Sequence, residues 1–215
     1  MTVSAKICGL NTPESVDAAV SGGADFIGIV FYPPSPRYVA PTDAARLIEE
    51  VPPEITRVGL FVDATDETIS ETLDAVDLDM LQLHGSETPE RIGQLRERFG
   101  CTTMKAIKVE STPDIATAEK FEGSADWLLF DAKPPKEMTG ALPGGNALAF
   151  DWHLLEGYSW KKPWMLSGGL NCENVADAVS ISGAPAVDVS SGVEDRPGFK
   201  SPSKIETFLE TIKAL

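Results

Sequence analysis

The chain has 215 residues, of which 18 are Lys or Arg and 33 are Asp or Glu, so its formal net charge is −15. Unspecific nucleic-acid binding depends on basic side chains that displace counterions, so this charge excludes a generic nucleic-acid binder and argues equally against an anionic membrane surface as a partner. With 42% hydrophobic and 24% charged residues, the composition is typical of a soluble globular protein that buries a full core.

Eight short apolar runs alternate with longer amphipathic runs, the pattern of strand and helix units on a parallel sheet. Most of the apolar runs are dense in Ile, Val, Leu and Phe, as strands buried on both faces must be. The predicted strands are Val3–Cys8, Asp25–Phe31, Arg57–Val62, Met80–Leu83, Thr103–Ile107, Trp127–Phe130, Trp164–Leu166 and Val187–Val189.

Four of the helices have a recognisable start. A Ser or Thr hydroxyl caps a helix well, and proline fits its first position because the missing N–H has no partner there in any case. This device occurs at Thr12-Pro13, Thr88-Pro89, Ser111-Thr112-Pro113 and Ser201-Pro202.

Eight such units in about two hundred residues favour a closed (β/α)8 barrel, the TIM barrel, over an open doubly wound sheet of five or six strands. No shift in composition divides the chain, so we expect one α/β domain over residues 1–215. The segment 132–162 is irregular and rich in proline and glycine, with only a short helical candidate at Phe150–Gly157. After the sixth strand of a barrel, such a loop would lie over the face where active sites are built.

The cysteine pattern and the N-terminus bear on the compartment. Cys8, Cys101 and Cys172 form an odd set without a Cys-x-x-Cys pair, so we expect neither a disulfide framework nor a cysteine zinc site. No signal-peptide pattern opens the sequence, and no stretch reaches the ~18 apolar residues of a membrane span. We therefore expect a cytoplasmic protein.

Chemically useful side chains follow the predicted strands. Cys8 closes the first strand, Arg37 follows the second, His84 follows the fourth and Asp131 ends the sixth. In a barrel the carboxyl ends of all strands meet at one face, so these four side chains are expected to converge there.

The last two strands lead into glycine-containing turns, Ser-Gly-Gly-Leu at 167–170 and Ser-Ser-Gly-Val-Glu at 190–194. Free backbone N–H groups and a helix N-terminus make an anion cradle, and the loops after strands seven and eight are the usual phosphate site of this barrel. The predicted phosphate-binding residues are Gly168, Gly169, Ser191 and Gly192.

The order of these motifs resembles the phosphoribosylanthranilate isomerase family of tryptophan biosynthesis. The motifs are Lys-Ile-Cys-Gly, Ser-Pro-Arg, Gln-Leu-His-Gly, Phe-Asp, Ser-Gly-Gly-Leu followed by Asn-Val, and Asp-Val-Ser-Ser-Gly-Val-Glu with Pro-Gly-x-Lys, spanning Lys6 to Lys200. The resemblance implies an Amadori rearrangement of N-(5-phosphoribosyl)anthranilate to 1-(2-carboxyphenylamino)-1-deoxy-D-ribulose 5-phosphate. It also implies a small phosphosugar substrate and no metal or organic cofactor, while the sequence leaves the oligomeric state open.

The family pattern assigns the catalytic roles. Cys8 is the implied base that removes a proton from C2′, and Asp131 is the implied acid that protonates the ribose ring oxygen. A thiol is a weak base until it ionises, so either its pKa must be lowered in the protein or the substrate must favour the thiolate, as the iminium cation would when it forms. Asp131 must carry its proton at neutral pH, which requires apolar or anionic surroundings.

Arg37 and His84 are the implied substrate contacts beside this pair. The Arg37 guanidinium would hold the anthranilate carboxylate with two parallel hydrogen bonds. His84 would lie beside the substrate or order the loop after the fourth strand. Lys6 shares the strand parity of Cys8 and would also face the barrel interior, so we predict a buried ion pair with Asp188 on the eighth strand, with a secondary effect on Cys8.

Two positions depart from the family pattern. Gly144-Gly145-Asn146-Ala147 stands where the family usually has glycine-glycine-threonine-glycine, and alanine disfavours a positive φ at 147, so we expect a differently closed or more mobile loop. Lys200-Ser201 replaces the common lysine-aspartate, which fits a role for Ser201 as cap of the last helix.

Several alternatives remain. The related isomerase of histidine synthesis uses two aspartates, whereas the first strand here ends in cysteine. A metal-dependent pentose-phosphate epimerase needs a His/Asp ligand set, yet the chain has only His84 and His153. An indole-glycerol-phosphate synthase needs a lysine at a strand end, and Lys133 lies past the strand. The non-enzyme alternative is a phosphate-binding barrel that has lost catalysis.

Overall fold

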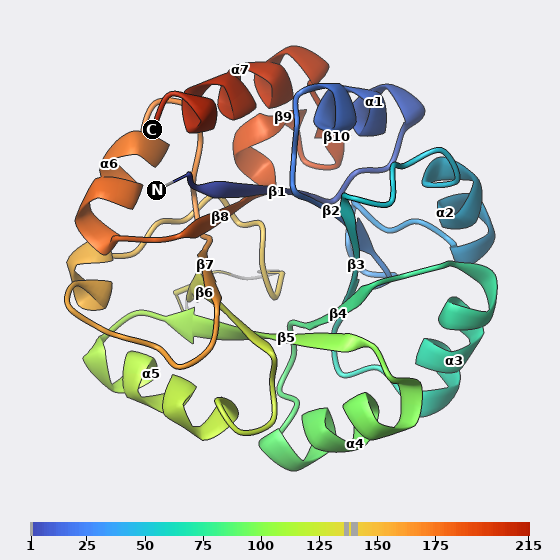
Figure 1. Cartoon of the computed structure of the whole chain (residues 1–215), viewed down its shortest axis with the longest axis horizontal. Helices are drawn as coiled ribbons and strands as arrows, with labels where there is room; N and C mark the ends of the chain where they lie inside the picture. The colour runs from blue at the N-terminus through green and yellow to red at the C-terminus, as the bar shows by residue number, and fades with distance from the viewer. Residues whose placement is uncertain (1, 136–137, 139–141) are drawn as a thin grey trace.

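The structure is a computed structural model that describes residues 2–135, 138 and 142–215. Eight parallel strands close into a barrel in chain order, and helices surround it (Figure 1). This confirms the predicted (β/α)8 fold. The strands are β1 Ser4–Cys8, β2 Phe26–Val30, β3 Thr56–Phe61, β4 Met80–Leu83, β5 Thr102–Val109, β6 Trp127–Ala132, β7 Trp164–Leu166 and β8 Ala186–Val189.

The predicted strand ends lie within two residues of those in the structure, and β4 and β7 match at both ends. Closure of the barrel depends on pairing of the first and last strands, in which Lys6 lies beside Asp188 and Ile7 beside Val189. The α-helices are α1 Pro13–Ser21, α2 Pro41–Leu47, α3 Asp66–Ala75, α4 Pro89–Phe99, α5 Thr112–Ala116, α6 Val175–Ser182 and α7 Pro202–Lys213. No helix among the described residues is long and apolar enough to cross a membrane.

Three short 3-10 helices complete the helical layer, η1 Thr117–Phe121, η2 Trp152–Leu155 and η3 Ser191–Val193. Of these, η2 falls within the predicted helical segment Phe150–Gly157. A small antiparallel hairpin, β9 Glu194–Arg196 and β10 Phe199–Lys200, follows η3.

The helix starts agree with the sequence at the two threonine caps. The hydroxyls of Thr12 and Thr88 accept from the amides of Ser15 and Arg91. At α5, the Asp114 carboxylate reaches back instead and accepts from the amide and the hydroxyl of Ser111. Ser201 occupies the predicted cap position of α7, but its side chain makes no cap hydrogen bond, so the prediction that its hydroxyl caps this helix was wrong.

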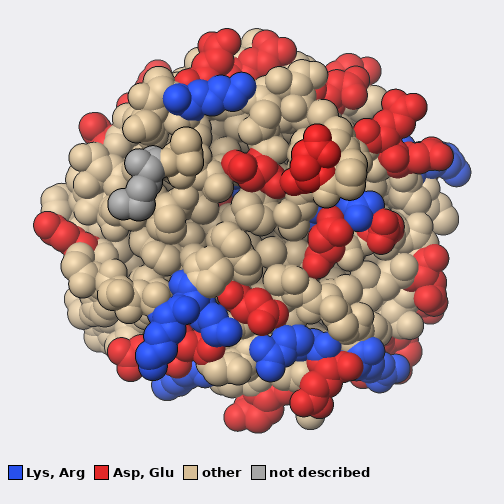
Figure 2. Space-filling model, viewed as in Figure 1, with Lys and Arg blue, Asp and Glu red and all other residues tan. Residues whose placement is uncertain are grey.

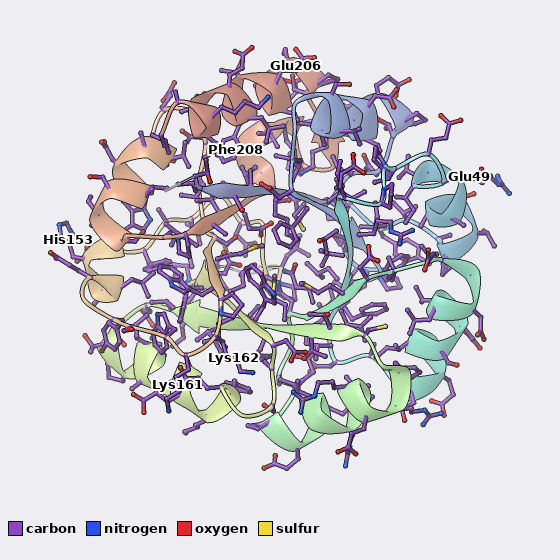
Figure 3. All side chains as sticks on the ribbon, in the orientation of Figure 1. Glu49, His153, Lys161, Lys162, Glu206 and Phe208 are labelled. Carbon is purple, nitrogen blue, oxygen red and sulfur yellow. The ribbon has the colours of Figure 1, made fainter. Side chains whose placement is uncertain are left out.

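Apolar side chains fill two regions of the molecule. One lies between strands and helices, where Phe208 of α7 points inward while Glu206 of the same helix projects outward (Figure 3). The other fills the barrel interior near the strand starts, where the rings of Phe26 and Trp127 meet edge to face. Farther along the strands the interior becomes polar, and that change positions the site.

Candidate active site

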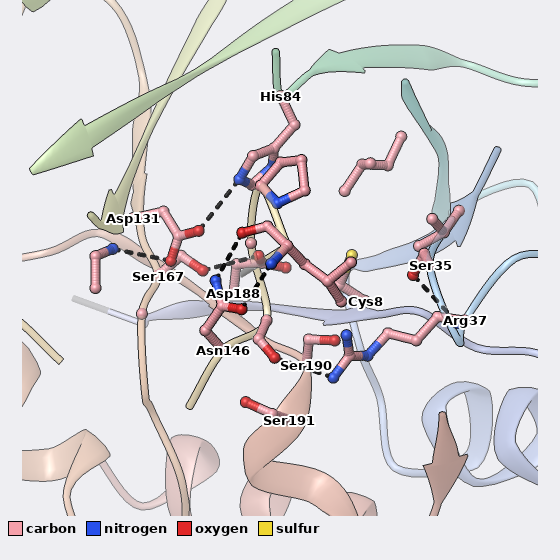
Figure 4. Close-up of a pocket in the computed structure, with 18 of the residues that line it drawn as sticks. Cys8, Ser35, Arg37, His84, Asp131, Asn146, Ser167, Asp188, Ser190 and Ser191 are labelled. Atoms are coloured by element: carbon pink, nitrogen blue, oxygen red, sulfur yellow. Dashed lines mark hydrogen bonds and ion pairs between the residues drawn. The ribbon is translucent and has the colours of Figure 1, made fainter. Parts of the chain in front are cut away.

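A pocket opens at the carboxyl ends of the barrel strands (Figure 4). Seven of the eight predicted site residues line it, namely Cys8, Arg37, His84, Asp131, Gly168, Gly169 and Ser191. The eighth, Gly192, lies behind the lining, where a Cβ atom would stand 1.8 Å from the carbonyl oxygen of Leu170. Only glycine permits this close approach, which brings the turns after β7 and β8 together.

Cys8 ends β1 above a buried ion pair. The Lys6 Nζ lies 2.8 Å from the Asp188 Oδ1, and the Ser167 hydroxyl donates to the Asp188 Oδ2 at 3.0 Å. The ion pair predicted from strand parity is therefore confirmed. Burial alone would lower the pKa of Lys6, but the Asp188 carboxylate and Cys8 outweigh it and raise the pKa.

The surroundings of the Cys8 thiol oppose its ionisation on balance. Burial raises the pKa of Cys8, and the negative charge of Asp188 adds to this, while the ammonium groups of Lys6 and Lys200 oppose it. A nearby positive charge stabilises a thiolate, so Lys6 makes ionisation of this buried thiol easier than burial alone would allow.

Asp131 faces the same pocket from β6, across from Cys8 (Figure 4). Its Oδ2 lies 3.1 Å from the His84 Nε2, and its Oδ1 accepts from the amide of Ala132 at 2.9 Å. On the other side of the imidazole ring, the Gln82 Nε2 lies 2.9 Å from the His84 Nδ1. The three side chains form one buried chain of hydrogen bonds that ends at the predicted acid.

Arg37 is buried and already holds a carboxylate of the protein. Its Nε and Nη2 donate to the two carboxylate oxygens of Glu194 at 2.7 and 2.9 Å, and Nη2 also donates to the carbonyl oxygen of Gly145 at 3.2 Å. The fork expected for the substrate is thus occupied by Glu194. The Nη1 group donates to no acceptor among the described residues, so it is the part of the guanidinium that a substrate carboxylate could use.

Glu194 also binds Lys200, whose Nζ lies 2.7 Å from its Oε1 and donates to the carbonyl oxygen of Ser190 at 2.8 Å. Burial lowers the pKa of Lys200 to about 8, with a smaller contribution from the charge of Arg37. Burial alone would raise the pKa of Glu194, but Arg37 and Lys200 together hold it below its ordinary value. Two cations therefore share one anion beside the turn that leads to Ser191.

The two glycine turns have the geometry expected of an anion cradle. Gly168 and Gly169 have φ angles of +93° and +63°, in the region that favours glycine. Within the described ranges, the main-chain amides of Gly168, Gly169, Ser191 and Gly192 donate to no protein acceptor. These N–H groups can therefore serve an anionic ligand.

The long loop reaches the pocket between Leu142 and Leu148, while parts of segment 132–162 lie outside the described residues. A Cβ atom on Gly144 would stand 2.7 Å from the His84 Nε2, and one on Gly145 would stand 2.7 Å from the Arg37 Nη1. Ala147 has a φ of +57°, so the expectation that alanine would avoid a positive φ here was wrong. The loop keeps this backbone turn although a left-handed alanine costs about 1–2 kcal/mol.

Comparison with known proteins agrees with this geometry. Residues 5–211 match the family model described as N-(5'phosphoribosyl)anthranilate (PRA) isomerase. The chain belongs to the phosphoribosylanthranilate isomerase family. It is 54% identical over 213 residues to the N-(5'-phosphoribosyl)anthranilate isomerase of Parvibaculum lavamentivorans, covering 99% of both chains. It is also 54% identical over 215 residues to the protein of that name from Rhodospirillum centenum, covering all of both.

Solved structures of this family have the same fold. Phosphoribosyl anthranilate isomerase from Thermotoga maritima is 39% identical, with a TM-score of 0.88 over 99% of this chain and 100% of that one. A second structure, 37% identical with a TM-score of 0.85 over the same shares of the two chains, is of the isomerase in complex with reduced 1-(o-carboxyphenylamino)-1-deoxyribulose 5-phosphate.

Sequence reasoning missed three residues that shape the site, namely Gln82, Ser167 and Glu194. Gln82 could have been found by parity, since it lies on β4 two residues before His84, which follows the strand directly. Glu194 ends the motif Asp-Val-Ser-Ser-Gly-Val-Glu, but its partner Arg37 lies 157 residues away in the sequence, and no local pattern connects the two.

Proposed function

We infer that this chain catalyses the Amadori rearrangement of N-(5-phosphoribosyl)anthranilate to 1-(2-carboxyphenylamino)-1-deoxy-D-ribulose 5-phosphate. The observation that carries this inference is the placement of Cys8 and Asp131 on facing walls of one pocket, in a chain that belongs to the isomerase family. One acid and one base on facing walls are what the reaction requires.

The reaction begins with proton transfer from Asp131 to the ribose ring oxygen. The bond between C1′ and this oxygen breaks, and the nitrogen lone pair forms the C1′=N bond of an iminium cation. Cys8 then removes the proton from C2′, and the electrons of that C–H bond form the C1′=C2′ bond of an enolamine. A proton is finally added at C1′ while the C2′ hydroxyl loses its own, which gives the ketone.

The iminium charge assists the base. The resting thiol of Cys8 has a raised pKa because it is buried, so it acts as a base only when a positive charge develops beside it. Lys6 supplies a fixed part of that charge and the substrate supplies the rest in the intermediate. The rate of proton removal is thereby coupled to opening of the ring.

The substrate is a small phosphosugar, and its two anionic groups have separate donors. The free amides of the turns after β7 and β8 receive the phosphate, and the Nη1 side of Arg37 receives the anthranilate carboxylate. The ribose then lies between these donors, within reach of Cys8 and Asp131.

The test is the decay of substrate fluorescence when purified protein meets freshly generated phosphoribosylanthranilate. Decay by the wild type should exceed a protein-free control, and both Cys8→Ser and Asp131→Asn should lower kcat by about 10²- to 10⁴-fold, the usual contribution of one general acid or base. Cys172→Ser, which changes an exposed cysteine, is the matched control and should keep full activity. No decay above the protein-free control would favour the non-catalytic phosphate-binding barrel.

A further inference from the structure

Gln82 is a fully buried polar side chain that the reaction scheme leaves without a role. It lines the pocket from β4, two residues before His84, and its Nε2 lies 2.9 Å from the His84 Nδ1. Its Oε1 is buried and has no hydrogen-bond partner among the described residues. A buried amide oxygen without a hydrogen-bond partner costs folding free energy, so a role for the amide nitrogen that contacts His84 would explain why this residue is present.

The orientation of the Gln82 amide indicates where the imidazole ring carries its proton. The structure places the amide nitrogen toward Nδ1, and since an amide N–H group only donates, Nδ1 offers a lone pair in this orientation. A neutral ring then carries its proton on Nε2, which lies 3.1 Å from the Asp131 Oδ2 and donates to it. Gln82 thus determines which ring nitrogen presents a proton to Asp131.

The surroundings keep the ring in this arrangement. His84 and Asp131 are each 4% exposed, and Gly144 lies so close that a Cβ atom there would stand 2.7 Å from Nε2 and 2.9 Å from Oδ2. The amide of Ala132 occupies the other oxygen of Asp131. When Asp131 carries its proton on Oδ2, that oxygen can still accept from the His84 Nε2–H group, and the two contacts leave the Asp131 O–H group free to point into the pocket.

We propose that Gln82 is a positioning residue for the acid step, which holds His84 with its proton on Nε2 and through that N–H group orients Asp131 toward the ribose ring oxygen. The geometric part of this proposal stands on the contacts alone. Its catalytic part rests on the proposed function. The two parts are therefore tested by separate measurements.

The geometric part is tested by 15N NMR of histidine-labelled protein without substrate. The chain has two histidines, and His153 projects from the outer surface (Figure 3) with a 64% exposed side chain, so His153→Gln assigns both rings. We expect the His84 Nδ1 to be unprotonated in the wild type and protonated in Gln82→Glu, because a carboxylate at position 82 accepts rather than donates. A proton on the wild-type Nδ1, or no change in Gln82→Glu, would overturn the proposal.

The catalytic part is tested by the kinetics of Gln82→Met, which keeps the side-chain volume but removes the amide. We expect kcat to fall by about 10- to 100-fold with KM within twofold, because misplacing a reacting group by about 1 Å costs this much. The control is Thr72→Val on α3, which also removes a buried hydrogen-bonding group but lies away from the pocket. It should lower thermal stability without lowering kcat.

The outcomes separate the two proposals. An inactive wild type with the expected histidine proton would overturn the proposed function and leave the geometric part standing. An active wild type whose kcat survives Gln82→Met would overturn the catalytic role of Gln82 alone.

Discussion

Lys6 carries a charge at a position with no exposure to solvent, and its partners explain why the barrel accepts it. The ammonium group neutralises the Asp188 carboxylate and lowers the pKa of the neighbouring Cys8, so on the proposed mechanism it also favours the thiolate that acts as base. A buried ion pair of this kind contributes little net stability, but removal of one partner leaves an uncompensated charge. The pair therefore belongs to the reaction as much as to the fold.

Lys6→Met tests this double role. The pKa of Cys8 should rise further, because the variant loses a cation that favours the thiolate and leaves the Asp188 charge unopposed, and both changes act in the same direction. The ascending limb of kcat/KM against pH, which reports ionisation of the base, should move to higher pH, and stability should fall by about 3–5 kcal/mol. Lys6→Arg keeps the charge, so its ascending limb should lie close to the wild-type position on the pH axis. If the limb of Lys6→Met stays at the wild-type position, Lys6 has a structural role only.

Glu194 holds the Arg37 guanidinium, so we expect it to affect substrate binding through Arg37. Replacing it by glutamine removes the charge that holds the guanidinium fork, so Arg37 should lose its fixed orientation while Cys8 and Asp131 are untouched. We expect KM to rise by about tenfold with kcat within twofold, the result for loss of binding shared by substrate and transition state. Asp195→Asn, on the exposed neighbouring residue of the same hairpin, should leave both constants unchanged. A lower kcat with an unchanged KM would contradict this role.

At the scale of single residues, the sequence predicted which side chains line the pocket wherever their position at the end of a strand is enough to place them there. Cys8, His84 and Asp131 were found in this way. The pairing of Arg37 with Glu194 was not predicted, because a guanidinium group can bind any carboxylate that the tertiary structure brings near it. The sequence motif identified Arg37, but it did not indicate that Arg37 binds a carboxylate of the protein.

At the scale of elements, the alternation of side chains along each strand sorts the site. In β4 the interior residues are Met80 and Gln82, followed by His84 just past its end, and in β8 they are Ala186 and Asp188. Each series runs from apolar to polar in the strand direction, so the barrel is packed at its start and reactive at its end. The period of two, applied only to Lys6 and Cys8, predicted the pair with Asp188; the same period applied to β4 would have found Gln82.

The loop after β6 was the element least open to sequence prediction. Its composition indicated irregular structure, but the positive φ of Ala147 and the contacts of Gly144 and Gly145 depend on side chains from other strands. A residue pattern cannot report such contacts, because the same glycines could equally serve turns that touch nothing.

Gly144→Ala and Gly145→Ala should separate the two functions of this loop. The first places a methyl group against His84 and Asp131, so we expect a lower kcat, by about tenfold or more. The second places a methyl group against the Arg37 guanidinium and adds backbone strain at a φ of +73°, so we expect a higher KM. Steady-state kinetics distinguish them, with Gly93→Ala as control, since nothing lies within 4 Å of a Cβ atom there. Identical effects on both constants in the two loop variants would mean that the loop acts only as a cover.

At the scale of the whole molecule, the charge of the protein opposes that of its substrate. The face in Figure 2 carries acidic side chains over much of its surface, with Lys and Arg gathered at fewer places. The site is different, since Arg37 and Lys200 share the single charge of Glu194 and Lys6 is matched by Asp188. A local excess of positive charge is thus held inside a molecule whose formal net charge is −15.

This arrangement predicts an unusual response to salt. The substrate carries a phosphate and a carboxylate, and a net negative protein repels it over distances up to about 10 Å at 0.1 M ionic strength, where screening becomes effective. Added salt reduces this repulsion but weakens the buried site contacts much less, because those groups are shielded from ions. We therefore expect kcat/KM to stay level or rise between about 0.02 and 0.2 M of a non-binding salt such as sodium chloride. Phosphate and sulfate are unsuitable, since they would compete for the amide cradle. A steep fall with sodium chloride would mean that exposed lysines and arginines guide the substrate, and the local site would then not be the main source of its capture.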